Sequence, residues 1–304
     1  MTLNNKTSLC LINVSLSEFL ESKKISKSQA KKWGVKAKTL EKTGTVEVPL
    51  NLLNNLLINP KFCGEEPSII FEDEHLIVLH KPVGIHNHPL SYLESDNCLS
   101  YLRETNPKNR ALFTDVERYD RGLLYRLDYL TSGLLIFSKR DGEADLYRQK
   151  QGNKFYLAIC EGKIKDNFSL ENFITYHGPK KSHAQVHLVG EEKEKANLIG
   201  TRVEYNDEQD LSLCLINLNQ GKRHQIRAQL SNFGFPILGD TQYGGGKSSR
   251  MFLHAYHYEF THFNNEYSLF DENLDLFERV FDLHRVSEML HQSVIRLKGS
   301  HSGK

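Results

Sequence analysis

The spacing of apolar residues changes near residue 67, and this change predicts two structural units. Before it, the segment SLSEFLESKKISKSQAKKW carries apolar residues at helical spacing, which favours two short helices that break around Lys24-Ile25. Ser26 has the hydroxyl side chain of an N-cap for the second helix. The segment NLLNNLLINP predicts a further short helix that stops before Pro60. We therefore predict a small N-terminal domain over residues 1–62.

Runs of β-forming residues dominate the chain after this point. The segment SIIFEDEHLIVLHKP predicts two strands, Ile69–Phe71 and Leu76–Leu79, on either side of an acidic turn. Six later segments also read as strands: LLIFSK, KFYLAICEG, HAQVHLVG, TRVEYN, LSLCLINLN and FLHAYHYEF.

Two helices are predicted among and after these strands. One runs from Arg223 to Phe233, with Gly234 where a C′ glycine would end it, and the other is the amphipathic segment RVSEMLHQSVIRL. Many strands with few helices between them predict an α+β fold with a mixed, mainly antiparallel sheet, not a doubly wound one. We place this second domain at residues 67–298.

Composition agrees with a soluble globular chain of two domains. Of the 304 residues, 39% are hydrophobic and 25% are charged. No apolar stretch approaches the roughly 20 residues of a membrane helix, and the N-terminus lacks the pattern of a secretory signal. The five cysteines are scattered without a CxxC pair, which argues against a disulfide framework or a zinc site. We expect a cytoplasmic protein.

The net charge of the chain is only +1, but one segment is rich in lysines. The segment KKISKSQAKKWGVKAKTLEK carries eight lysines against one glutamate, and Lys31 and Lys32 lie at its centre. Such a patch can hold phosphates at one end of a neutral molecule, although a solvated lysine-rich helix face has the same pattern.

Motif searches exclude several chemistries and leave one carboxylate to explain. The chain has no P-loop, no GxGxxG between a strand and a helix, no HExxH and no GxSxG. In YRLDYLTSGLLIFSK, however, Asp128 stands among apolar residues, where burial is costly without a partner. Arg223 and Arg227 of GKRHQIR, or the neighbouring Arg126, could supply the opposite charge. An aspartate with an arginine and no histidine base indicates a nucleophile or small base.

Five segments, in the same order, resemble the motifs of the RluA-type pseudouridine synthases. HKPVGIHNHP is similar to the KPxG…HP segment of that family, and RLDYLTSG to its RLDxxTSG motif. KFYLAICEG resembles the segment that supplies the family's active-site tyrosine. GKRHQIRAQLSNFGFPILGDTQYGG resembles GRxHQIRxHL…GxPIxGDxxYG, and FLHAYHYEF the LHA strand. Together they span roughly residues 70 to 260, and TSG and HQIR favour the RluA branch over the RsuA branch.

The resemblance implies a role for each motif residue. Asp128 would attack or deprotonate the ribose, Tyr156 would lie against the flipped base, and Arg227 would keep Asp128 ionised. Arg126 would fill the space that the extruded nucleotide leaves in the RNA. The family uses no cofactor and no metal. Further residues expected to contact RNA are Lys81, Arg223, His224, Lys31 and Lys32.

Some features depart from the family's pattern. Tyr125 stands where a histidine is common, and Arg223 where threonine or serine is common. The N-terminal segment fits the two-helix start of an S4 RNA-binding domain but lacks its Val-Asn-Gly-like ending. Both a degenerate S4-like domain and an unrelated helical extension therefore stay open.

The sequence thus predicts a monomeric RNA pseudouridine synthase that acts on a uridine in structured RNA, either rRNA or tRNA. Two rival functions use the same residues differently. A non-catalytic RNA chaperone on the same fold would bind RNA whether or not Asp128 is intact. A carboxylate-dependent hydrolase would need a second acidic residue paired with Asp128.

Overall fold

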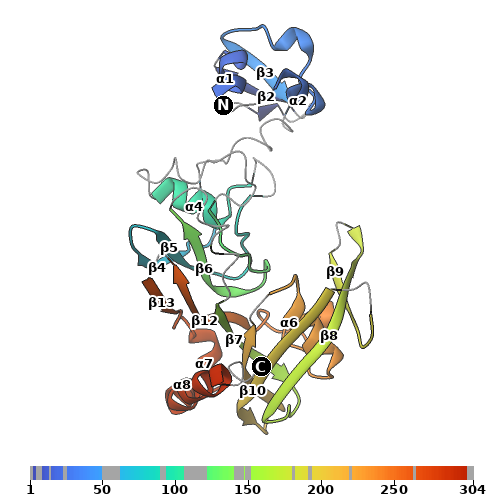
Figure 1. The fold of residues 1–304 in the computed structure, drawn as a ribbon, viewed down its shortest axis with the longest axis vertical. Helices are drawn as coiled ribbons and strands as arrows, with labels where there is room; N and C mark the ends of the chain where they lie inside the picture. The colour runs from blue at the N-terminus through green and yellow to red at the C-terminus, as the bar shows by residue number, and fades with distance from the viewer. Residues whose placement is uncertain are drawn as a thin grey trace. The chain divides into compact units, whose positions relative to one another are not determined.

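The computed structural model divides the chain into two compact units (Figure 1). The first contains Met1–Glu66, Ile85–Gly122 and Lys139–Asp141, and the second contains Pro67–Gly84, Leu123–Ser138 and Gly142–Lys304. The structure describes residues 3–4, 9–13, 15–22, 26–49, 62–89, 94–105, 122–139, 147, 152–179, 182–190, 194–218, 221–262 and 265–299.

The first unit combines short helices with a small antiparallel sheet. Its elements are β1 (Leu3–Asn4), β2 (Leu9–Asn13), α1 (Leu16–Ser22), α2 (Lys27–Lys32), η1 (Ala37–Thr39), β3 (Thr45–Pro49) and α4 (Cys98–Thr105). The predicted N-cap is confirmed, because the Ser26 hydroxyl accepts a hydrogen bond from the Gln29 N–H at 3.1 Å. The three strands and α4 were not predicted, and the helix predicted before Pro60 lies outside the described residues.

The second unit is built on one large sheet. Its strands are β4 (Ser68–Glu72), β5 (Leu76–Lys81), β6 (Ser132–Ser138), β7 (Asn153–Glu161), β8 (Asn167–His177), β9 (His183–His187), β10 (Glu194–Asn206), β11 (Leu211–Leu218), β12 (Leu253–His262) and β13 (Asn265–Phe270). Their order is β4-β5-β6-β12-β7-β11-β10-β8-β9, with β13 paired to β12. Among these described strands only β6 and β12 pair in parallel, so the predicted mixed, mainly antiparallel sheet is confirmed.

Helices cover this sheet where its side chains are apolar. The long helix α8 (Leu283–Gly299) buries Val286, Leu290 and Val294 at helical spacing in one core with leucines of β11. Helix α6 (Gln225–Asn232) contacts β8 and β9. The remaining elements are α7 (Asp275–Glu278) and the short helix η5 (Thr241–Tyr243). No helix in the described part of the chain is long and apolar enough to cross a membrane.

A glycine fixes where β6 begins, immediately after the Asp128 turn. Gly133 has φ +110°, and its register partner in the parallel pair is Ala255 of β12. A Cβ atom at Gly133 would lie 2.3 Å from the Ala255 carbonyl oxygen and 2.5 Å from its nitrogen. Only glycine therefore allows the two backbones to approach this closely.

We predict that Gly133→Ala lowers the free energy of unfolding by about 3 kcal/mol or more, because it adds a backbone clash to a strained φ. The matched control is Gly234→Ala, where φ is +92° but no atom lies within 4 Å of the added Cβ. That variant should lose only about 1–2 kcal/mol. Urea unfolding followed by circular dichroism measures both losses, and equal losses would contradict the close-approach argument.

Candidate active site

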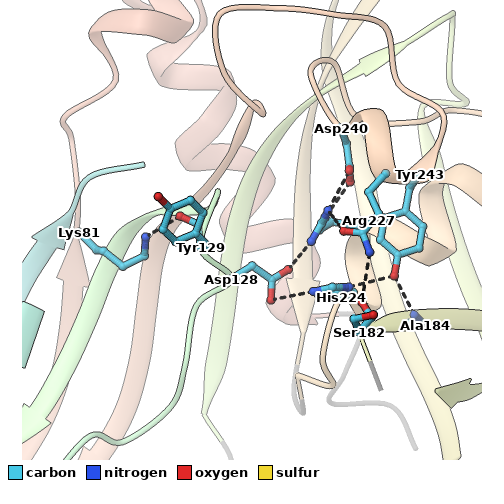
Figure 2. Close-up of polar contacts among 10 residues, drawn as sticks. Lys81, Asp128, Tyr129, Ser182, Ala184, His224, Arg227, Asp240 and Tyr243 are labelled. Atoms are coloured by element: carbon cyan, nitrogen blue, oxygen red, sulfur yellow. Dashed lines mark hydrogen bonds and ion pairs between the residues drawn. The ribbon is translucent and has the colours of Figure 1, made fainter. Parts of the chain in front are cut away.

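The turn that carries Asp128 is held through its backbone. The Thr131 N–H donates to the Asp128 carbonyl at 3.1 Å, and the Gly84 N–H donates to the Tyr129 carbonyl at 2.9 Å. The ammonium of Lys81 also donates to the Tyr129 carbonyl, at 3.2 Å (Figure 2). These bonds place the Asp128 carboxylate, whose side chain is 22% exposed, at a fixed position before β6.

Helix α6 brings an arginine to this carboxylate from 99 residues further along the chain. The Nη1 of Arg227 donates to the Asp128 Oδ2 at 3.1 Å (Figure 2). The contact that the resemblance implied is therefore present. The roles of the two residues in catalysis stay predictions.

A second carboxylate, Asp240, holds the other side of the same arginine. Arg227 donates from Nε to the Asp240 Oδ2 at 2.7 Å and from Nη2 to the Asp240 Oδ1 at 2.8 Å. Nη2 also donates to the Gln242 side-chain oxygen at 3.0 Å. Burial alone would lower the pKa of Arg227, but the bonds to Asp240 and the charge of Asp128 outweigh it, so the pKa is raised. The guanidinium is therefore charged and rigidly oriented.

His224 lies beside the other oxygen of the Asp128 carboxylate and is bound in turn by Tyr243. The His224 Nε2 lies 3.8 Å from the Asp128 Oδ1, and its Nδ1 is hydrogen-bonded to the Tyr243 hydroxyl at 2.9 Å. Burial lowers the pKa of His224 by more than the charge of Asp128 raises it. The imidazole is therefore neutral at pH 7, and Arg227 is the cation that neutralises Asp128.

Tyr156 supplies an uncharged ring from β7. Its side chain is buried, and burial together with the charge of Asp128 raises the pKa of its hydroxyl well above the ordinary value. The phenol stays protonated at any physiological pH. Such a ring can stack on a base without adding a charge beside the carboxylate.

This arrangement can perform nucleophilic or base chemistry with one carboxylate. An ionised Asp128 has lone pairs left after it accepts the bond from Arg227, so it can attack or take a proton. Asp240 is a poor second catalytic carboxylate, because it is 1% exposed and both of its oxygens bind Arg227. The geometry therefore disfavours the acid–base pair that a carboxylate-dependent hydrolase would need.

The other predicted RNA contacts fall into two groups. Arg126 and Arg223 are exposed on the second unit, and Lys31 and Lys32 are exposed on α2 of the first, so all four can reach a ligand. Lys81 requires a correction, because its side chain is fully buried and its ammonium donates to the carbonyls of Pro82 and Tyr129. It positions the Asp128 turn instead of contacting RNA.

Sequence reasoning missed three residues of the site and one beside it. Asp240, Gln242 and Tyr243 belong to the GDTQY segment, which was matched as a motif but given no role. Lys154 lies two residues before Tyr156 on β7, with its ammonium 4.7 Å and 5.1 Å from the ring centres of Tyr125 and Tyr258. Burial lowers the pKa of Lys154 to about 8.

Comparison with protein families shows the family to which this chain belongs. Residues 75–232 match the family model described as RNA pseudouridylate synthase. The chain belongs to the RNA pseudouridylate synthase family. The match includes Asp128, Tyr156 and Arg227, and the motifs identified in the sequence place it in the RluA-type branch.

Individual relatives of this pseudouridine synthase family agree. The chain is 32% identical over 212 residues to ribosomal large subunit pseudouridine synthase D of Borreliella burgdorferi, covering 67% of this chain and 64% of that protein. It is 32% identical over 199 residues to the RNA pseudouridine synthase YhcT of Bacillus subtilis, covering 62% of each. The chain thus spans somewhat less than two thirds of the length of these two relatives.

A solved structure shows the same fold. Human RNA pseudouridylate synthase domain containing 1 superposes with a TM-score of 0.56 at 20% identity, covering 69% of this chain and 84% of that one. The large sheet with its helices therefore has the pseudouridine synthase fold. An S4-like fold for the first unit stays a prediction.

The two carboxylates bound to Arg227 should differ in their effect on stability. We predict that Asp240→Asn lowers the free energy of unfolding by about 3–5 kcal/mol, because it leaves a buried guanidinium without its bidentate partner. Asp128→Asn should cost less than about 1 kcal/mol, because Arg227 keeps Asp240. Urea unfolding monitored by far-UV circular dichroism compares the two, and similar losses would show that Arg227 depends equally on both.

The lowered pKa of Lys154 should appear in the pH dependence of stability. Its folded pKa is about 8, whereas an unfolded lysine titrates near 10.4. Between these values the unfolded chain binds more protons at this residue, so its contribution to stability rises with pH. Lys154→Met should therefore remove a rise in stability between about pH 8 and pH 10.

The matched control for this prediction is Lys163→Met, which removes an exposed lysine that lies over the single ring of Tyr205. Unfolding midpoints of wild type and both variants, measured across this pH range, test the difference. If the stability of Lys154→Met still rises with pH as steeply as that of wild type, the titrating group is another residue.

Proposed function

We propose that this chain is an RNA pseudouridine synthase that converts a uridine in structured RNA to pseudouridine, with Asp128 as the nucleophile or base. The observation that carries the proposal is the Asp128 carboxylate, part-exposed and bound by one nitrogen of an arginine that Asp240 otherwise clamps. Family membership supports the reaction class. The geometry supports the choice of residue.

The reaction requires the target base to leave the RNA stack. Arg126, which is exposed two residues before Asp128, would fill the vacated space. Asp128 attacks the ribose C1′ or removes a ribose proton as the N1–C1′ bond breaks. The freed uracil then rotates against the Tyr156 ring. C5 bonds to C1′ as the Asp128–C1′ bond breaks or as Asp128 returns the proton to the ribose, the C5 proton leaves for solvent and N1 gains a proton. Atoms and electrons balance without a cofactor or metal.

Arg227 would allow the Asp128 carboxylate to act as a nucleophile or base close to the phosphates of RNA. A lone carboxylate in this position would repel the phosphates of RNA. Arg227 offsets that charge through one bond of 3.1 Å and leaves the second Asp128 oxygen for the substrate. Neutral His224 adds no second cation that would weaken the nucleophile further.

Ribosomal RNA is the substrate that the relatives favour. The relatives from Borreliella burgdorferi and Pseudomonas aeruginosa are both named for the large ribosomal subunit. We therefore propose rRNA ahead of tRNA. Lys31 and Lys32 of the first unit would contribute phosphate contacts, which predict strong salt dependence and little sequence choice. We propose a cytoplasmic monomer.

Tritium release from RNA labelled at uridine C5 tests the reaction, because joining C5 to the ribose expels that hydrogen. We predict release by wild type and at least a 1,000-fold slower release by Asp128→Asn, roughly the loss expected when a covalent nucleophile is removed. Binding of the same RNA should change little. Turnover by Asp128→Asn would remove Asp128 from the mechanism. Tight binding without release by wild type would favour the non-catalytic RNA chaperone.

A further inference from the structure

Two neighbouring residues of η5 tie the catalytic site to the hairpin of β8 and β9. The Tyr243 hydroxyl accepts a bond from the Ala184 N–H of β9 at 2.8 Å and is bonded to His224 at 2.9 Å (Figure 2). Gln242 binds Arg227 through its oxygen and donates from Nε2 to the Ser182 carbonyl at 3.1 Å. These hydrogen bonds therefore fix the position of the hairpin relative to the groups that surround Asp128.

Planar side chains form a continuous array that runs from Arg227 to this hairpin. The Arg227 guanidinium carbon lies 5.0 Å from the centre of the Tyr243 ring. The His183 ring stacks on the same tyrosine, with centroids 4.8 Å apart and planes 19° apart. His177 faces His183 across the hairpin at a centroid distance of 5.9 Å and an angle of 30°. His177 is exposed and His183 is partly buried.

The charges around this array suit a nucleic acid. Arg223, exposed next to His224, places a cation beside the hairpin. The nearby carboxylate of Glu194 is paired with the Lys222 ammonium at 2.9 Å, which reduces its repulsion of phosphate. Planar rings with an adjacent cation are the features that bind unpaired nucleotides.

We propose that His177 and His183 form a stacking subsite for an unpaired nucleobase next to the target uridine. This rests on the proposed function, because extrusion of the target leaves a neighbouring base without its stacking partner. An imidazole plane accepts any base, so the subsite would contribute affinity and orientation without reading sequence. Because Tyr243 connects His183 to His224 and Arg227, a base seated there would be aligned with Asp128.

The experiment compares two labelled 12-mers, oligouridine and an abasic ribose-phosphate chain of the same length, by fluorescence anisotropy. All variants are measured in the same buffer, at one pH and one salt concentration. We expect His177→Ala to weaken oligouridine binding about 5- to 20-fold and to leave binding of the abasic chain unchanged. His177→Trp should restore or exceed wild-type binding of oligouridine. His284→Ala, which removes an exposed histidine of α8, is the matched control.

Equal weakening on both 12-mers, or no weakening on either, would overturn the subsite. Circular dichroism melting checks that each variant folds. The outcome is separable from the proposed function through tritium release by the same wild-type protein. Tritium release together with unchanged oligouridine binding by His177→Ala would reject the subsite and support the proposed reaction. Weaker oligouridine binding by His177→Ala without tritium release would support the subsite and contradict the proposed reaction.

Discussion

The site depends on how Arg227 divides its guanidinium between two carboxylates. Two of its nitrogens bind the buried Asp240 in a fork, which fixes the plane of the group, and the third reaches Asp128. The bidentate pair resists rotation far better than a single bond would. Asp128 is consequently held by an arginine that is anchored elsewhere. The Asp128 carboxylate keeps one oxygen for a substrate. A change in the charge of Asp128 leaves the pair between Arg227 and Asp240 intact.

The large sheet makes this division possible, because the residues concerned lie far apart in the chain. The parallel pairing of β6 with β12, allowed by Gly133, sets the end of the Asp128 turn. The buried ammonium of Lys81 holds the Tyr129 carbonyl of the same turn. Each contact fixes backbone, so the position of the carboxylate is set by the fold and not by a flexible side chain.

Local patterns predicted the elements well and the polar contacts less well. Eight strands of the large sheet, the Ser26 cap and the Asp128–Arg227 pair followed from spacing and from the family resemblance, whereas β8, β13 and the strands of the first unit were not predicted. Helix α6 starts at Gln225 and not at Arg223, because His224 takes a left-handed φ of 55°. The strand predicted from TRVEYN starts earlier, at Glu194, because charged and polar residues of that stretch alternate with buried ones. Burial of Lys81 was beyond prediction, because a lysine before Pro-Val-Gly looks the same whether its ammonium meets water or carbonyls.

The remaining physical problem is how a site with two carboxylates binds a polyanion. Asp240 is neutralised by its fork with Arg227, and burial keeps its charge away from a ligand. Two groups that interact with Asp128 besides Arg227 are uncharged, since His224 is neutral and Tyr156 keeps its proton. Recognition near the nucleophile can therefore rely on ring surfaces, which do not compete with the substrate for the carboxylate. Arg126 and Arg223 are exposed, so the cations expected to contact phosphates are separate from Arg227, which binds Asp128.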